Sequence, residues 1–181
     1  MQASTTHILI VLFLRTISID GTTYNRAEYK IIEDGFPLEI HNITTDDGYI
    51  LKAHRIPNPG RPVMLLNHGF VASSDAFLWL GKNHALPYQA FEANFDVWML
   101  NCRGNWYSSQ HKKISSLHPK FWKFSIHEIG MYDLPAAFDY ILKTTNRTKL
   151  HYVGHSQGTA VFLIFQSERQ SIINLWPQLI F

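Results

Sequence analysis

A serine between two glycines is the feature of this 181-residue sequence that most clearly offers chemistry. Residues 151–162 read HYVGHSQGTAVF, so Gly154, Ser156 and Gly158 follow the pattern Gly-x-Ser-x-Gly. Just before the motif, KLHYV (149–153) predicts a strand. The run GTAVFLIFQSE (158–168) predicts a helix that is apolar nearly all round and therefore buried. A serine on a sharp turn between a strand and a helix is typical of a nucleophile whose hydroxyl stands clear of the backbone.

The glycines and the following helix both suit this chemistry. The turn is so tight that side chains two residues before and after Ser156 would meet neighbouring backbone. The first N–H of the helix, on Gln157, can donate to a developing oxyanion. A second donor is expected from the loop His68-Gly69-Phe70, which directly follows an apolar run, and the candidate is the N–H of Phe70.

The elements that position these groups are predicted from apolar runs and turn signals. VMLLN (63–67) and DVWML (96–100) suit strands buried on both faces, and residues 85–95 predict a helix. The sequence LEIHNITTDDGYILKAHRIP predicts two strands joined at Asp46-Asp47-Gly48. A capping box at Ser125 opens a helix that ends at Asn146, with a kink at Pro135. Strands that alternate with helices predict an α/β fold with a mostly parallel sheet, and the hairpin lies at one edge.

Composition excludes several classes of function. The net charge is +2, the pI is about 8.7 and the basic residues are scattered, so a nucleic-acid partner is not expected. The single Cys102 excludes an internal disulfide, and we expect it to be buried. His151 and His155 have a spacing that gathers metal ligands only on a helix, and no phosphate loop or dinucleotide motif occurs. We expect no metal and no cofactor.

The N-terminus predicts secretion. Ile8–Leu14 is a seven-residue apolar run, which suits a signal peptide over residues 1–21 and leaves residues 22–181 as one domain. The alternative is an ordinary N-terminal strand or helix. The run is far below the roughly 20 residues that span a bilayer, so no transmembrane segment is expected. Sequons at Asn42 and Asn146 predict glycosylation.

Several long stretches together resemble one family. DGYILKAHRIP, LLNHGF, DVWMLNCRGNWYSSQH, FWKFSIHEIGMYDLPAAFDYIL and LHYVGHSQGT are similar to the acid lipases, the gastric and lysosomal type of α/β-hydrolase. The resemblance implies hydrolysis of triacylglycerols or sterol esters at a lipid–water interface by a secreted or lysosomal glycoprotein. It also implies Ser156 as nucleophile, with the N–H groups of Phe70 and Gln157 as oxyanion hole. Phe70 stands where leucine is common, a change that a backbone donor tolerates.

The sequence departs from the family after the nucleophile. In the family a cap, an Asp and a His follow, whereas no His or Asp follows Ser156 here. We expect a truncated α/β-hydrolase with little lipase activity of its own, and a bare apolar edge on the strand KLHYV. No upstream histidine is expected to act as base, and Asp133 is expected to be structural. The alternatives are a non-catalytic lipase-like protein that binds lipid or a partner, and a truncated gene product without function.

Overall fold

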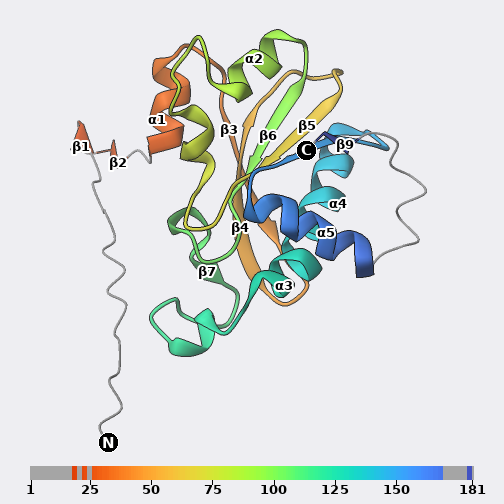
Figure 1. Cartoon of the computed structure of the whole chain (residues 1–181). Coiled ribbons are helices and arrows are strands. Elements are labelled where there is room, and N and C mark those ends of the chain that lie inside the picture. Colours follow the sequence, from red (N-terminus) through yellow and green to blue (C-terminus); the bar gives the residue numbers. More distant parts are fainter. Residues whose placement is uncertain (1–17, 20–21, 24–25, 169–178, 181) are drawn as a thin grey trace, which may run out of the picture.

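A mixed seven-stranded sheet forms the centre of the molecule, and helices pack on both of its faces (Figure 1). The computed structural model describes residues 18–19, 22–23, 26–168 and 179–180. The strand order is β3-β4-β6-β5-β8-β9, and β7 pairs with β4 outside this path; β1 and β2 form a separate small hairpin. The strands are β1 (Ser18–Ile19), β2 (Thr22–Thr23), β3 (Glu39–Thr44), β4 (Tyr49–Ile56), β5 (Val63–Asn67), β6 (Asp96–Leu100), β7 (Gln110–His111), β8 (His151–Gly154) and β9 (Leu179–Ile180).

The pairing of the strands confirms the predicted sheet. β3 and β4 form an antiparallel hairpin at one edge, and β4 runs antiparallel to β6. From β6 onward, the pairs β6–β5, β5–β8 and β8–β9 are all parallel. The carboxyl ends of β5 and β8 therefore lie side by side, which is where an α/β sheet holds its ligands.

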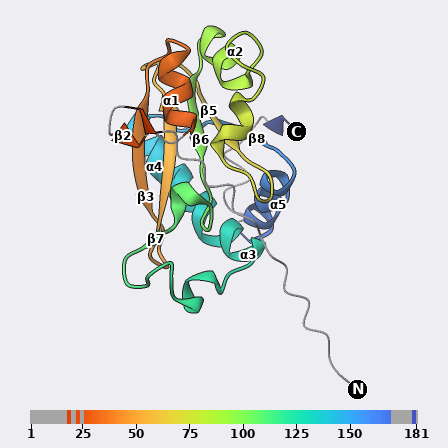
Figure 2. The same ribbon diagram turned by 90° about the vertical axis from the view of Figure 1, so that its left-hand side faces the viewer.

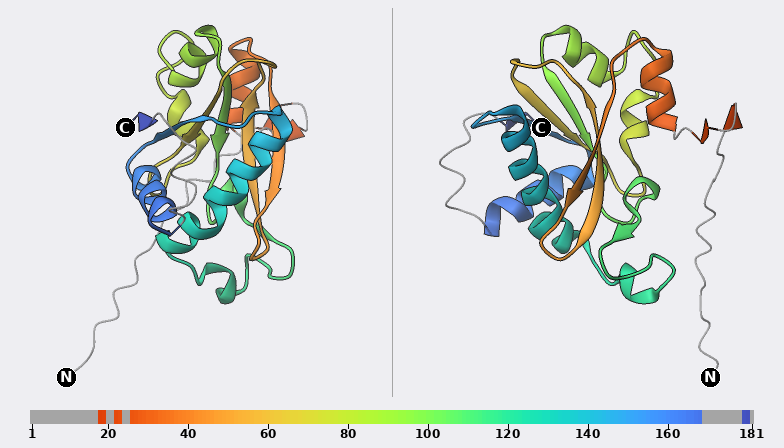
Figure 3. Two further views of the ribbon diagram at one scale, coloured as in Figure 1. Left: turned by 90° about the vertical axis from the view of Figure 1, so that its right-hand side faces the viewer. Right: turned by 180° about the vertical axis from the view of Figure 1, so that it is seen from behind.

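Two apolar clusters, one on each face, explain why β5 and β6 are buried throughout. Met64 and Leu66 face a cluster that includes Ile31 and Tyr88, under α1 and α2. Val63 and Leu65 of β5 face the second cluster, which also contains residues of helices α4 and α5. Figure 3 shows the sheet nearly edge-on, with α1 on one side and α4 and α5 on the other. The helices are α1 (Arg26–Glu33), α2 (Leu86–Glu92), α3 (Ile126–Glu128), α4 (Leu134–Thr145) and α5 (Gln157–Glu168), with 3₁₀ turns η1 (Ser74–Leu78), η2 (Trp106–Ser108) and η3 (Pro119–Trp122).

The predicted helix after Ser125 is interrupted rather than simply kinked. Ser125 and Glu128 form the expected capping box at the start of α3. Ile129–Asp133 then forms a π turn, labelled η4, in which the N–H of Leu134 donates to Ile129 O. Pro135 has no N–H to give to the carbonyl four residues earlier, which accounts for altered hydrogen bonding one turn before it. Asn146 ends α4 in the left-handed conformation, as expected.

Three features differ from the sequence prediction. Helix α1 was not predicted, because it has only eight residues and, of its apolar positions, only Ala27 and Ile31 belong to the buried core. Helix α2 ends at Glu92 rather than near residue 95, since Asn94 adopts a positive φ of 65°. The edge of β8 is not bare, because β9 pairs with it at Tyr152 and Val153.

The predicted signal segment, residues 1–21, lies outside the described residues except at β1. Figure 2 shows the main body of the chain from a second side. Among the described helices, none is both long enough and apolar enough to cross a membrane.

Candidate active site

Ser156 lies at the corner between β8 and α5, and its side chain is exposed. Its φ is +53°, a left-handed conformation that a non-glycine residue adopts at a cost of about 1 kcal/mol or more. Helix α5 begins at the next residue, near the middle of the molecule in Figure 1. The hydroxyl therefore projects from a strained corner with the positive end of a helix beside it.

Both glycines of the motif are required by close backbone contacts. A Cβ on Gly154 would lie 2.7 Å from the nitrogen of Thr159, within the first turn of α5. A Cβ on Gly158 would lie 2.5 Å from the carbonyl oxygen of Asn67, at the end of β5. The structure thus confirms that any side chain at these two positions would clash with backbone.

The loop after β5 lies directly against the serine corner. Asn67 and Gly154 are register partners, and His155 N–H donates to Asn67 O at 3.0 Å. A Cβ on Gly69 would lie 3.3 Å from Ser156 Cβ and 2.9 Å from His155 Nδ1. Gly69 is therefore needed for close packing of the loop against the serine corner itself.

The two predicted oxyanion donors lie on either side of this contact. Phe70 follows Gly69, and Gln157 follows Ser156. Within the described part of the chain, neither N–H is hydrogen-bonded to another group. Gly69 O accepts from Ala72 N–H at 3.3 Å, which closes a turn in which Val71 has a φ of +53°. No sequence signal predicted a left-handed conformation at Val71, since a β-branched side chain disfavours it.

The His68 side chain holds the loop after β5 in place through hydrogen bonds. It is buried, and its Nδ1–H donates to Gly69 O at 2.8 Å. Its Nε2 accepts from Cys102 N–H at 3.1 Å, and Asn105 Nδ2 lies 3.2 Å away. Burial lowers the pKa of His68, so the ring stays neutral and keeps both its donor and its acceptor. The neutral His68 ring thus links the backbone of the loop at Gly69 to the backbone of Cys102.

A buried chain of hydrogen bonds, not predicted from the sequence, joins β5 to the first turn of α5. Asn67 Nδ2 donates to Tyr152 Oη at 2.9 Å, and that hydroxyl donates to Gly158 O at 2.7 Å. The Cys102 thiol donates to Asn67 Oδ1 at 3.1 Å. Burial raises the pKa of Cys102, which keeps it a thiol and confirms the predicted buried cysteine. Sequence pattern gave no signal for contacts between residues this far apart.

Asp133 has a structural partner. Its carboxylate accepts from Arg103 Nε at 2.6 Å and from Arg103 N–H at 2.8 Å. Arg103 also binds both oxygens of Asp47, at 2.6 and 2.8 Å, and its guanidinium carbon lies 4.0 Å from the Tyr49 ring centroid. Burial raises the pKa of Asp133 to about 6, because desolvation outweighs the attraction of Arg103. This cluster ties the hairpin turn to the loop after β6 and to η4.

None of the described upstream histidines is a hydrogen-bond partner of the Ser156 hydroxyl. Within the described residues, no hydrogen bond joins the Ser156 hydroxyl to a histidine or a carboxylate. His151 contacts the Phe95 ring, and His127 lies on α3. The predicted sequon residues lie elsewhere: Asn42 is exposed on edge strand β3, and Asn146 is exposed at the end of α4. No three His, Cys, Asp or Glu side chains cluster as a metal site in the described ranges.

Comparison with known proteins agrees with this geometry. Residues 62–174 match the family described as alpha/beta hydrolase fold, and residues 27–81 match a partial alpha/beta-hydrolase lipase region. The chain is 50% identical to Lipase 1 of Drosophila melanogaster over 139 residues, which cover 77% of this chain and 32% of that protein. It is 41% identical to bovine (Bos taurus) gastric triacylglycerol lipase over 142 residues, 74% of this chain and 36% of that protein.

The chain spans about a third of the length of these curated relatives. Among solved structures, an esterase from Pyrococcus furiosus superposes with a TM-score of 0.56 at 19% identity, over 77% of this chain and 50% of that one. A bacterial membrane phospholipase A superposes with a TM-score of 0.54 at 17% identity, over 80% of this chain and 40% of that one. These structures share the fold. With the serine corner, the parallel sheet and the family match over most of its length, this chain belongs to the α/β-hydrolase fold family.

Proposed function

We propose that the chain carries the nucleophile region of a lipase, a carboxylic ester hydrolase with Ser156 as nucleophile. The observation that carries this proposal is the left-handed Ser156 at a corner where Gly154 and Gly158 meet backbone. Identity of 50% and 41% to proteins named as lipases supports the same class of reaction.

The reaction would begin with attack of Ser156 Oγ on an ester carbonyl carbon. The C=O electron pair moves onto oxygen, and the N–H groups of Phe70 and Gln157 stabilise the resulting oxyanion. Collapse expels the alcohol and leaves an acyl-serine, which water then hydrolyses. The hydroxyl proton must pass to a base, and within the described residues no side chain is hydrogen-bonded to the Ser156 hydroxyl. The 181-residue chain alone is therefore expected to be a poor catalyst.

The proposed substrates are neutral lipid esters such as triacylglycerols or sterol esters, and the proposed location is that of a secreted or lysosomal protein. Both proposals rest on the resemblance to the acid lipases. Residues 1–21 would be the signal peptide and residues 22–181 a partial hydrolase domain. Exposure of Asn42 and Asn146 suits their use as glycosylation sites.

A second candidate is a non-catalytic lipase-like protein that binds lipid or a partner. Within the described residues, no histidine is hydrogen-bonded to the Ser156 hydroxyl, which favours this candidate. The two candidates differ in whether the Ser156 hydroxyl is reactive once a base is supplied.

Covalent labelling separates the two candidates. The chain, the variant Ser156→Ala and the matched variant Ser167→Ala, which removes an exposed serine at the other end of α5, are incubated with an alkyl fluorophosphonate and analysed by peptide mass spectrometry. We expect one slow adduct on Ser156, faster when imidazole is added as base, and unchanged in Ser167→Ala. Equal labelling of Ser156→Ala, or no acceleration by imidazole, would reject the nucleophile proposal.

Ester turnover tests the expected weakness of the chain alone. A serine hydrolase without its triad partners retains roughly 10³- to 10⁴-fold catalysis over water. With a p-nitrophenyl ester as substrate, we expect the Ser156-dependent rate to be no more than about 10⁴ times the rate of the reaction with water. A turnover near the enzyme median of about 10 s⁻¹ would contradict this expectation.

A further inference from the structure

The segment Gln110–His127, called the basic segment below, projects from the body of the molecule. Its eighteen residues contain four lysines, at 112, 113, 120 and 123, and no Asp or Glu. In the sequence these lysines appear as part of a scattered basic population. Figures 1 and 2 show that the segment forms a single blue-green lobe at the lower end of the molecule.

The lobe is held to the body through its buried side chains. Phe121 is fully buried and packs on Tyr49, whose hydroxyl donates to Phe121 O. His111 Nε2 lies 3.0 Å from Asp47 O, and its Nδ1 accepts from the N–H of Lys113 at 2.9 Å. Ile114 and Phe124 also pack against the core, so the lobe is anchored on the body of the molecule near the β3–β4 turn.

The outward side chains are cationic and apolar. All four lysines are exposed, and none forms an ion pair within the described residues. Leu117 is 94% exposed and Trp122 is 50% exposed. Trp122 Nε1 donates to Ser116 O at 2.8 Å, which brings the indole beside the residue that precedes Leu117.

Neighbouring carboxylates compensate only part of this charge. Asp47 is bound by Arg103, and Glu128 accepts from both the N–H and the hydroxyl of Ser125. Asp46, which is exposed in the adjoining turn, and Glu128, whose hydrogen bonds to Ser125 favour its ionised form, offer two negative charges against four positive ones, so a net positive charge remains.

We propose that the basic segment docks the protein onto an anionic lipid surface. Lysines are attracted to negatively charged headgroups, which strengthens binding about fivefold for each lysine near the surface. A half-exposed tryptophan beside an exposed leucine suits the boundary between headgroups and acyl chains. Cationic and apolar side chains on one anchored lobe thus match both layers of such a surface.

Docking is separate from the ester chemistry proposed above. The lobe carries none of the groups around Ser156, although Gly104, which follows β6, packs against it: a Cβ there would lie 2.5 Å from the Phe124 ring. Docking therefore does not depend on whether Ser156 is a nucleophile, and each proposal can fail alone.

Vesicle cosedimentation tests the proposal, with the Ser156→Ala chain used throughout so that no hydrolysis occurs. Vesicles contain phosphatidylcholine alone or with about a third phosphatidylserine. We expect binding to the anionic vesicles only, weakened by 0.5 M salt, on the order of twentyfold weaker in Lys120→Gln/Lys123→Gln, and also weaker in Leu117→Ser.

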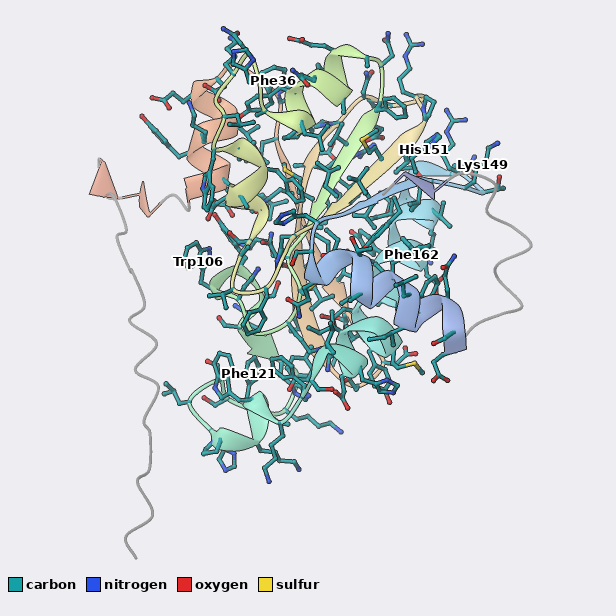
Figure 4. All side chains as sticks on the ribbon, viewed as in Figure 1. Phe36, Trp106, Phe121, Lys149, His151 and Phe162 are labelled. Atoms are coloured by element: carbon teal, nitrogen blue, oxygen red, sulfur yellow. The ribbon has the colours of Figure 1, made fainter. Side chains whose placement is uncertain are left out.

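The matched control is Lys143→Gln/Lys149→Gln, which removes the same charge from exposed positions elsewhere. Figure 4 places Lys149 at the opposite end of the molecule from Phe121. The control should bind almost as the parent does. Equal losses in the two double variants, equal binding to neutral vesicles, or no binding at all would overturn the proposal. Fluorophosphonate labelling of Ser156 in the otherwise unmodified Lys120→Gln/Lys123→Gln chain should be unchanged.

Discussion

The proposed nucleophile, Ser156, depends on neighbouring residues that leave its corner undisturbed. Gly158 is the most sensitive neighbour, because its missing Cβ would lie 2.5 Å from Asn67 O and 3.2 Å from His68 O. Both oxygens belong to backbone that also carries the loop before Phe70. A side chain at residue 158 would therefore separate the serine corner from the predicted second donor.

Gly158→Ala is expected to destabilise the chain by about 2–3 kcal/mol through this overpacking. Gly60→Ala is the comparison, since residue 60 has a φ of +84° and open space around it, and should cost only about 1 kcal/mol for backbone strain. Urea unfolding measures both. A cost for Gly158→Ala no larger than that for Gly60→Ala would show that the contact with Asn67 can relax.

The residues proposed to carry out the chemistry could be predicted from the sequence. The hydrogen bonds that hold these residues in place could not. Ser156, Gly154 and Gly158 stand in a local pattern whose steric reason holds in the structure. The hydrogen bonds from Asn67 to Tyr152 and from Arg103 to Asp133 join residues 85 and 30 positions apart. Periodicity and turn signals report only local order, so no sequence pattern indicated these pairs.

Among the helices, α5 depends on a close contact with η4. A Cβ on Gly130 would lie 2.7 Å from Ile164 Cγ2 and 3.0 Å from Val161 O, both on α5. The π turn therefore sets how closely α5, which begins beside Ser156, can approach the rest of its layer. The capping box and Pro135 predicted a helix and an irregularity here, but not the π turn itself or its close contact with α5.

Gly130→Ala is expected to cost about 1–3 kcal/mol and to slow labelling of Ser156, because α5 must shift to admit the methyl group. Lys143→Ala, on an exposed position of α4, should stay within about 0.5 kcal/mol. Thermal unfolding and labelling rates are measured on the same samples. A destabilised Gly130→Ala chain that labels at the parent rate would show that η4 does not position the serine.

Strands and turns with strong local signals could be predicted, and elements defined by tertiary contact could not. The β3–β4 hairpin and the buried strands β5 and β6 follow their sequence patterns closely. Two-residue strands such as β7 and β9 exist only through pairing with a neighbour. The sheet is consequently wider than the sequence alone indicated.

Stability of the complete chain should depend on pH through Asp133. Burial raises the pKa of this carboxyl from 3.8 to about 6, so between those values the folded chain holds a proton that the unfolded chain has released. Its contribution to stability is therefore fully present below about pH 4 and is lost as the pH rises through 6. Two pKa units correspond to about 3 kcal/mol.

Asp133→Asn removes this titration while keeping the shape of the side chain. The free energy of unfolding of the parent minus that of the variant should fall by about 3 kcal/mol between pH 4 and pH 7, measured by urea unfolding. Groups that titrate in both proteins cancel in this difference. A difference that stays constant or rises with pH would mean that the ion pair with Arg103 outweighs desolvation.

One hydroxyl and two backbone amides form the proposed active site, and a structure of the covalent adduct tests all three. In a crystal of the chain modified by an alkyl fluorophosphonate, we expect phosphorus on Ser156 Oγ. Its phosphoryl oxygen should lie about 2.7–3.1 Å from the nitrogens of both Phe70 and Gln157. An adduct on another residue, or a phosphoryl oxygen turned away from both amides, would contradict the proposed active site.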